Sequence, residues 1–69
     1  MTRRFLLSAL SYGHLQSRVE GASRYLTVLG VSFSVSQLFQ SGDYWNARFT
    51  VTCDRSKMKN VRTIMSSFA

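Results

Sequence analysis

Few residues in this chain of 69 could carry acid–base or nucleophilic chemistry: one His, one Cys and three acidic residues. His14 and Cys53 could pair as a general base and a nucleophilic thiol, an arrangement used in covalent catalysis. Other roles suit them better, because His14 stands at the expected start of a helix and Cys53 falls on the core side of an alternating strand. We therefore expect no enzymatic activity and no catalytic residue.

Local structure explains the three acidic residues. Asp43 belongs to a turn, Asp54 is a preferred N-cap for the helix that follows, and Glu20 lies on a helix surface four residues before Arg24. One Cys and one His cannot build a structural zinc site, and neither a P-loop nor a GxGxxG motif is present. No metal, cofactor or small-molecule substrate is therefore expected.

An excess of positive charge is the feature that indicates a partner. The chain carries nine Lys or Arg and a formal net charge of +6. Most of the excess lies in the last helix and at the N-terminus, where side chains could bind phosphates or an acidic protein. A solvated helix face without a partner is the alternative. The candidate contacts are Arg3, Arg4, Arg55, Lys57, Lys59 and Arg62.

A second group of residues has the composition of a protein interface. The first strand is apolar on both faces, so its edge would expose Leu6 and Leu10 unless a second subunit or a partner strand covers it. Trp45 is either a core residue near the hairpin turn or an interface anchor. We expect a homodimer through the first strand or a bound partner protein; the alternative is a buried strand whose outer face is shielded by Tyr12 or by the tail. The candidate interface residues are Leu6, Leu10, Tyr44, Trp45 and Arg48.

Hydrophobic periodicity predicts the elements that position these groups. The apolar run at 4–10 predicts a strand, although two arginines before apolar residues also resemble a targeting sequence. A helical period follows at 14–29, with Gly30 placed as a C-cap. Gly21 inside that helix predicts either a bend or a closely packed neighbour. A final helical stripe covers 55–68.

Residues 31–53 alternate with a period of two and predict a hairpin with a turn at 41–43. The alternation slips at 37–40, where a bulge would fit. Alternating residues from Trp45 to Cys53 form the core side of the second strand. Tyr44 would be the only aromatic on the opposite face, which argues against an RNA-recognition surface.

These elements predict a single compact α+β domain over residues 1–69. We expect a βαββα order with a three-stranded antiparallel sheet, strand order 1-3-2, and both helices on one face, a truncated ferredoxin-like fold. A single Cys and the lack of a membrane-length apolar stretch favour a cytoplasmic protein without membrane contact.

The expected function is that of a small basic binding protein. Very short, cofactor-free chains are common among accessory and inhibitor proteins of phages and mobile elements, so we expect this chain to dock on a host protein and modulate it. The alternative is direct, low-specificity DNA or RNA binding through the basic C-terminal helix.

Overall fold

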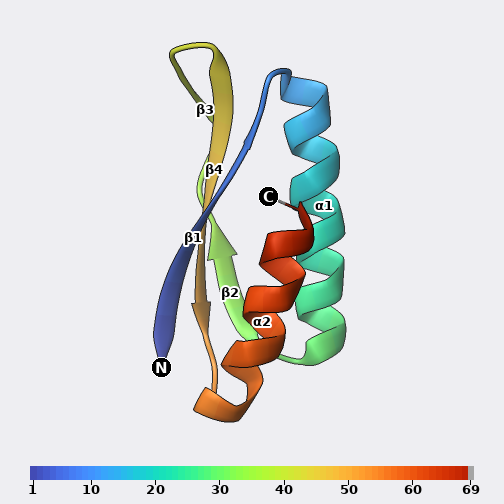
Figure 1. The fold of residues 1–69 in the computed structure, drawn as a ribbon, viewed down its shortest axis with the longest axis vertical. Coiled ribbons are helices and arrows are strands. Elements are labelled where there is room, and N and C mark those ends of the chain that lie inside the picture. The colour runs from blue at the N-terminus through green and yellow to red at the C-terminus, as the bar shows by residue number, and fades with distance from the viewer. Residues whose placement is uncertain (69) are drawn as a thin grey trace.

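A four-stranded antiparallel sheet is covered on one face by two helices, as Figure 1 shows. This computed structural model describes residues 1–68. Its elements are β1 (Thr2–Ala9), α1 (Tyr12–Leu29), β2 (Ser32–Val35), β3 (Phe39–Ser41), β4 (Tyr44–Thr52) and α2 (Arg55–Phe68). β4 is central: β1 pairs along one of its edges, while β2 and β3 follow one another along the other. The α+β class is therefore confirmed.

The expected second strand is interrupted and forms two strands. The prediction of a three-stranded sheet in the order 1-3-2, with its truncated ferredoxin-like label, is therefore wrong in the number of strands. Val35 lies opposite Phe49, and Phe39 lies opposite Asn46. Between these two pairs, the three residues 36–38 on this edge face the two residues 47–48 of β4. The slip expected at 37–40 is this one-residue bulge.

A serine stabilises the bulge. The Ser36 N–H donates to the Arg48 carbonyl at 2.9 Å, and the Ser36 hydroxyl accepts from the Arg48 N–H at 3.0 Å. The hydroxyl thus takes the place of a backbone carbonyl, and the regular ladder stops there. The shift also reverses the faces, so that Leu38 packs against the core and Phe39 lies on the opposite side of the sheet.

The limits of α1 follow from its caps. The Ser11 hydroxyl accepts from the His14 N–H at 3.2 Å, so the helix begins at Tyr12 rather than at His14. Gly30 has a φ of 81°, and its N–H donates to the carbonyls of Leu26 and Thr27. The predicted glycine C-cap is confirmed, because this left-handed conformation favours a residue without Cβ.

Gly21 marks a close approach of the two helices. A Cβ built at Gly21 would lie 2.6 Å from Cε1 of Phe68 and 3.0 Å from its Cζ. Of the two expectations for this glycine, the structure therefore shows the closely packed neighbour. The missing side chain leaves the space that the end of α2 occupies.

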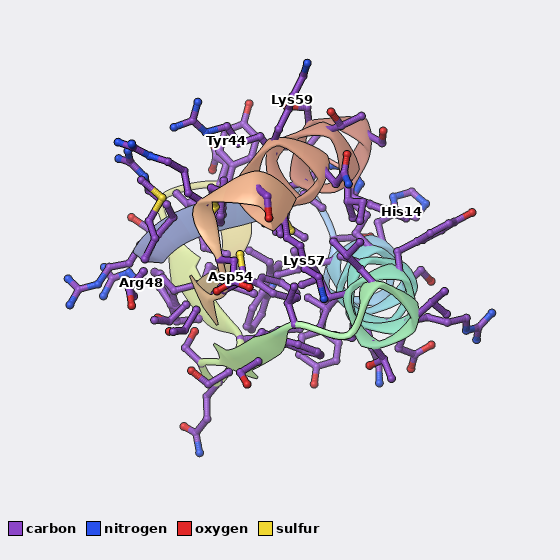
Figure 2. All side chains as sticks on the ribbon, turned by 90° about the horizontal axis from the view of Figure 1, so that it is seen from below. His14, Tyr44, Arg48, Asp54, Lys57 and Lys59 are labelled. Atoms are coloured by element: carbon purple, nitrogen blue, oxygen red, sulfur yellow. The ribbon has the colours of Figure 1, made fainter. Side chains whose placement is uncertain are left out.

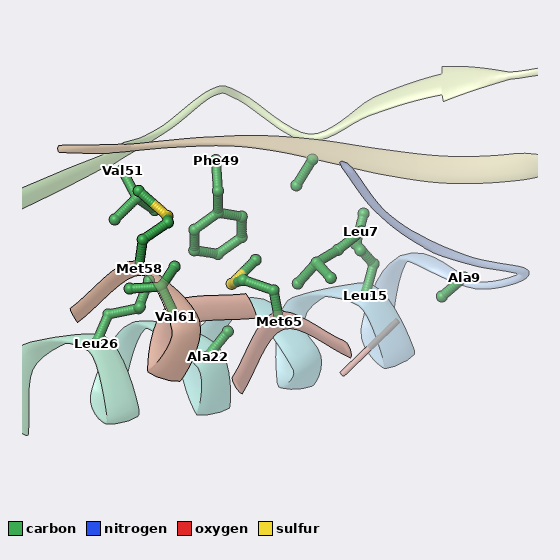
Figure 3. Close-up of a cluster of buried hydrophobic side chains, with 11 residues drawn as sticks. Leu7, Ala9, Leu15, Ala22, Leu26, Phe49, Val51, Met58, Val61 and Met65 are labelled. Carbon is green, nitrogen blue, oxygen red and sulfur yellow. The ribbon is translucent and has the colours of Figure 1, made fainter. Parts of the chain in front are cut away.

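The core lies between the sheet and the helices, and Figure 3 shows Phe49 extending from β4 toward them. β1, β4 and the two helices supply the fully buried side chains, whereas β2 contributes the half-buried Phe33 and Val35, which pack against them. On β1, Leu7 and Ala9 are buried while Leu6 is 54% exposed, so one face of this strand is covered and the other is open. The buried residues are Leu7, Ala9, Leu15, Ala22, Leu26, Ala47, Phe49, Val51, Met58, Val61 and Met65.

Candidate binding surfaces

Four of the predicted cationic contacts line one hollow between the start of β1 and α2. Three of them share a face of α2, since residues 55, 59 and 62 follow a helical period. Arg3 joins them because it lies opposite Val51, whose side chain is buried on the helix side of the sheet. We call this hollow of about 470 Å³ the basic groove, and its cations are Arg3, Arg55, Lys59 and Arg62.

The basic groove brings together like charges from the two ends of the chain. All four cationic side chains are exposed. Its other lining residues in the described part of the chain are Met1 and Met58, so none of the side chains that line it is a carboxylate. A concentration of one sign of charge in a concave surface raises the local potential and attracts anions.

Two predicted contacts lie outside the basic groove. Arg4 lies opposite Thr50 and lines a hollow on the open face of the sheet, away from the helices. Figure 2 shows Lys57 on the side of α2 that faces α1, whereas Lys59 points away from α1. The Lys57 Nζ lies 3.8 Å from where a Cβ on Gly30 would be, beside the C-terminus of α1. A cation at this place is favourable beside the partial negative charge of the helix end.

The open face of the sheet holds a second hollow, of about 410 Å³. Arginine and apolar side chains from three strands surround it, and we call Arg4, Leu6, Phe39 and Arg48 the outer-face patch. The Arg48 guanidinium carbon lies 5.0 Å from the centroid of the Phe39 ring, a cation–π contact.

Phe39 is the member of this patch that sequence reasoning missed. Continuing the alternation of β2 to residue 39 would have placed it in the core; the bulge turns it outward. The prediction that Tyr44 is the only aromatic on this face is therefore wrong. The signal that could have found Phe39 was the slip at 37–40.

A satisfied polar pair forms the floor beneath the outer-face patch. Asn46 is only 6% exposed, its Oδ1 accepts from the Ser8 hydroxyl at 2.6 Å, and its Nδ2 donates to the Tyr44 carbonyl at 3.2 Å. Because buried polar groups are costly unless they are paired, Asn46 serves the sheet rather than a ligand.

The predicted interface residues do not form one surface. Tyr44 and Arg48 share the open face, together with Leu6. Trp45 lies on the helix side opposite Ala9, half-buried, and packs edge-to-face on Tyr12 with ring centroids 5.1 Å apart. Leu10 lies just beyond β1 and is 70% exposed.

β1 has a free edge, since no strand within residues 1–68 pairs with it on the side away from β4. In an antiparallel ladder, alternate residues direct their backbone groups toward and away from the neighbouring strand. The Met1 carbonyl accepts from the Cys53 N–H at 3.0 Å, whereas the Ser8 carbonyl accepts from Nη1 of Arg18 at 2.6 Å. In β1, the backbone N–H and C=O groups of the even-numbered residues therefore point away from β4. Those with free N–H and C=O groups are Thr2, Arg4 and Leu6.

The residues that could carry catalysis are dispersed. His14 is exposed in the first turn of α1, and Cys53 lines a hollow with Gly30 beyond its last turn. A helix of 18 residues spans about 27 Å, so these side chains do not form a pair. Asp54 accepts backbone hydrogen bonds from Lys57 and Met58 through its carbonyl. Across residues 1–68, no group of three or more His, Cys, Asp or Glu could hold a metal ion.

Neither α1 nor α2, the helices of the described chain, combines the length and apolar content needed to cross a bilayer. Comparison of the chain with models of protein families, with curated proteins and with solved structures gave no match. The surfaces of the described chain that could bind a partner are the basic groove, the outer-face patch and the free edge of β1.

Proposed function

We propose that this protein is a non-catalytic binding protein that docks on an acidic surface of another protein. The observation that carries the proposal is the basic groove, where cations from β1 and α2 surround one hollow without a carboxylate among its lining residues. We further propose that it acts as an accessory or inhibitor protein of the kind found in phages and mobile elements, modulating the host protein to which it binds.

The outer-face patch supports a protein partner over a nucleic acid. It combines two arginines with an exposed Leu6 and with Phe39, and arginine and aromatic residues are enriched in protein interfaces. Binding of single strands relies instead on aromatic rings open to stacking by successive bases. Here the Arg48 guanidinium covers the Phe39 ring, so Tyr44 is left as the exposed ring on this face.

Affinity purification from the native host, with and without nuclease, tests the proposal. We expect a partner that survives nuclease treatment and is lost when Arg55, Lys59 and Arg62 are all changed to Gln. For a matched single-charge comparison, Lys59→Gln should weaken the complex and Arg24→Gln should not, because Arg24 is exposed on α1 away from the basic groove.

Two outcomes would contradict the proposal. Loss of every partner on nuclease treatment, with direct binding to mixed-sequence DNA or RNA that weakens steeply with salt, would establish the nucleic-acid alternative. Equal effects of Lys59→Gln and Arg24→Gln would mean that net charge, rather than the basic groove, drives association.

A further inference from the structure

The free edge of β1 lies between the two cationic surfaces. Consecutive residues of β1 point to opposite faces, so Arg3 contributes to the basic groove and Arg4 to the outer-face patch. The backbone groups that face away from β4 lie on the line between them. Any chain that paired with this edge would therefore have cations on both sides.

α2 forms one wall beside this edge. The basic groove lies between Arg3 and the first turns of α2, and a smaller hollow of about 110 Å³ continues beside Phe5 and Leu7 as far as Met65 and Ser66. Residues 55, 59, 62 and 66 follow one helical face, so α2 presents a polar, mostly cationic stripe along the edge.

We propose that the edge of β1 receives an extended acidic segment of the partner protein as an added strand. This inference rests on the proposed function and specifies how the partner is recognised. The main chain of the segment would pair with the free groups of Thr2, Arg4 and Leu6, which is the mode called β-augmentation. Successive side chains of the added strand would face opposite sides of the sheet. Those on one side would reach the basic groove, and those on the other side would reach Arg4 and Arg48. Acidic residues are therefore favoured on either side.

The length of the free edge limits the pairing. Arg18 occupies the Ser8 carbonyl, so the unpaired stretch runs from Thr2 to Leu6. At about 3.3 Å per residue this stretch spans roughly 17 Å, the length of an ordinary strand. A partner segment of that length can satisfy the edge completely.

Charge complementarity favours this occupant over a second copy of the chain. Each copy carries a net charge of +6, and β1 itself contributes Arg3 and Arg4. Pairing of two β1 edges would bring these like charges together, whereas an acidic strand would neutralise them.

A labelled peptide of about eight residues with alternating Glu and Thr serves as the probe, measured by fluorescence anisotropy at low salt. A matched analogue carries the same charges, but its backbone amides are N-methylated and cannot donate. We expect the analogue to bind roughly tenfold more weakly or worse, since each lost hydrogen bond removes up to about tenfold in affinity. Hydrogen exchange at the Arg4 and Leu6 amides should slow in the complex with the parent peptide.

The failure of this inference and that of the proposed function can be distinguished. If the analogue binds as tightly as the parent, and the Arg4 and Leu6 amides exchange unchanged, strand addition is wrong although docking on acidic surfaces stands. If Lys59→Gln leaves peptide binding unaltered as well, the basic groove is not the recognition site and both proposals fail. Absence of peptide binding, or a stable dimer that the peptide does not dissociate, would also overturn strand addition.

Discussion

The packing of Phe68 over Gly21 predicts that Gly21→Ala destabilises the protein when Phe68 is present and stabilises it when Phe68 is replaced by Ala. In Gly21→Ala, the new Cβ would lie 2.6 Å from Cε1 of Phe68, about 1 Å inside an ordinary carbon–carbon contact. The ring must then leave its place between the helices or push them apart. Forced overpacking costs about 1–3 kcal/mol, whereas Ala in place of Gly within a helix gains about 1 kcal/mol. We therefore expect Gly21→Ala to lower the free energy of unfolding by up to about 2 kcal/mol.

The sign should reverse when the ring is removed. In a Phe68→Ala background the crowding atoms are gone, and Gly21→Ala should raise the free energy of unfolding by about 1 kcal/mol. The two positions should therefore couple by about 1–3 kcal/mol. Urea unfolding of the four proteins, followed by circular dichroism, measures this coupling as long as the m-value is unchanged.

Equal stabilisation by Gly21→Ala in both backgrounds would refute the reasoning. It would mean that Phe68, which also lies against Tyr25 with ring centroids 5.8 Å apart, moves aside without cost. The glycine would then have no packing role, and its presence in the helix would lack a physical explanation.

Three further predictions concern stability, each with a matched control measured by urea unfolding. Ser36→Ala leaves the Arg48 N–H at the bulge without its acceptor and should cost about 1 kcal/mol, whereas Ser34→Ala in regular β2 should change stability by less than about 0.5 kcal/mol. Gly30→Ala forces Cβ into a φ of 81° and should cost about 1–2 kcal/mol, while Gly13→Ala, in an open part of α1, should stabilise by up to about 1 kcal/mol. Lys57→Gln removes a cation beside the C-terminus of α1 and should lower the free energy of unfolding by at most about 0.5 kcal/mol. Lys59→Gln should instead weaken binding to acidic probes. Equal effects of these two substitutions on stability would contradict their separate placement.

Sequence alone determined the features that depend on neighbouring residues. The inward positions of β4 follow from strict alternation, and the end of α1 follows from Gly30, because strand pleat, helix period and glycine caps act over a few residues. The helical stripe of α2 likewise predicted that Arg55, Lys59 and Arg62 share a face. These parts of the fold and of the candidate site could be predicted without tertiary information.

Tertiary structure decided how the surfaces are assembled. Arg3 joins the cations of α2 because β1 pairs with β4 so that Arg3 lies opposite Val51. The helical period alone places Lys57 on another side of α2, and the tertiary structure decided that this side meets the end of α1. Phe39 turns outward because Ser36 bonds to Arg48 and shifts the pairing by one residue. Each outcome depends on contacts between residues distant in the sequence. The slip in alternation at 37–40 indicated a bulge, but the direction in which Phe39 turns depends on the pairing of this edge with β4, which the local pattern does not contain.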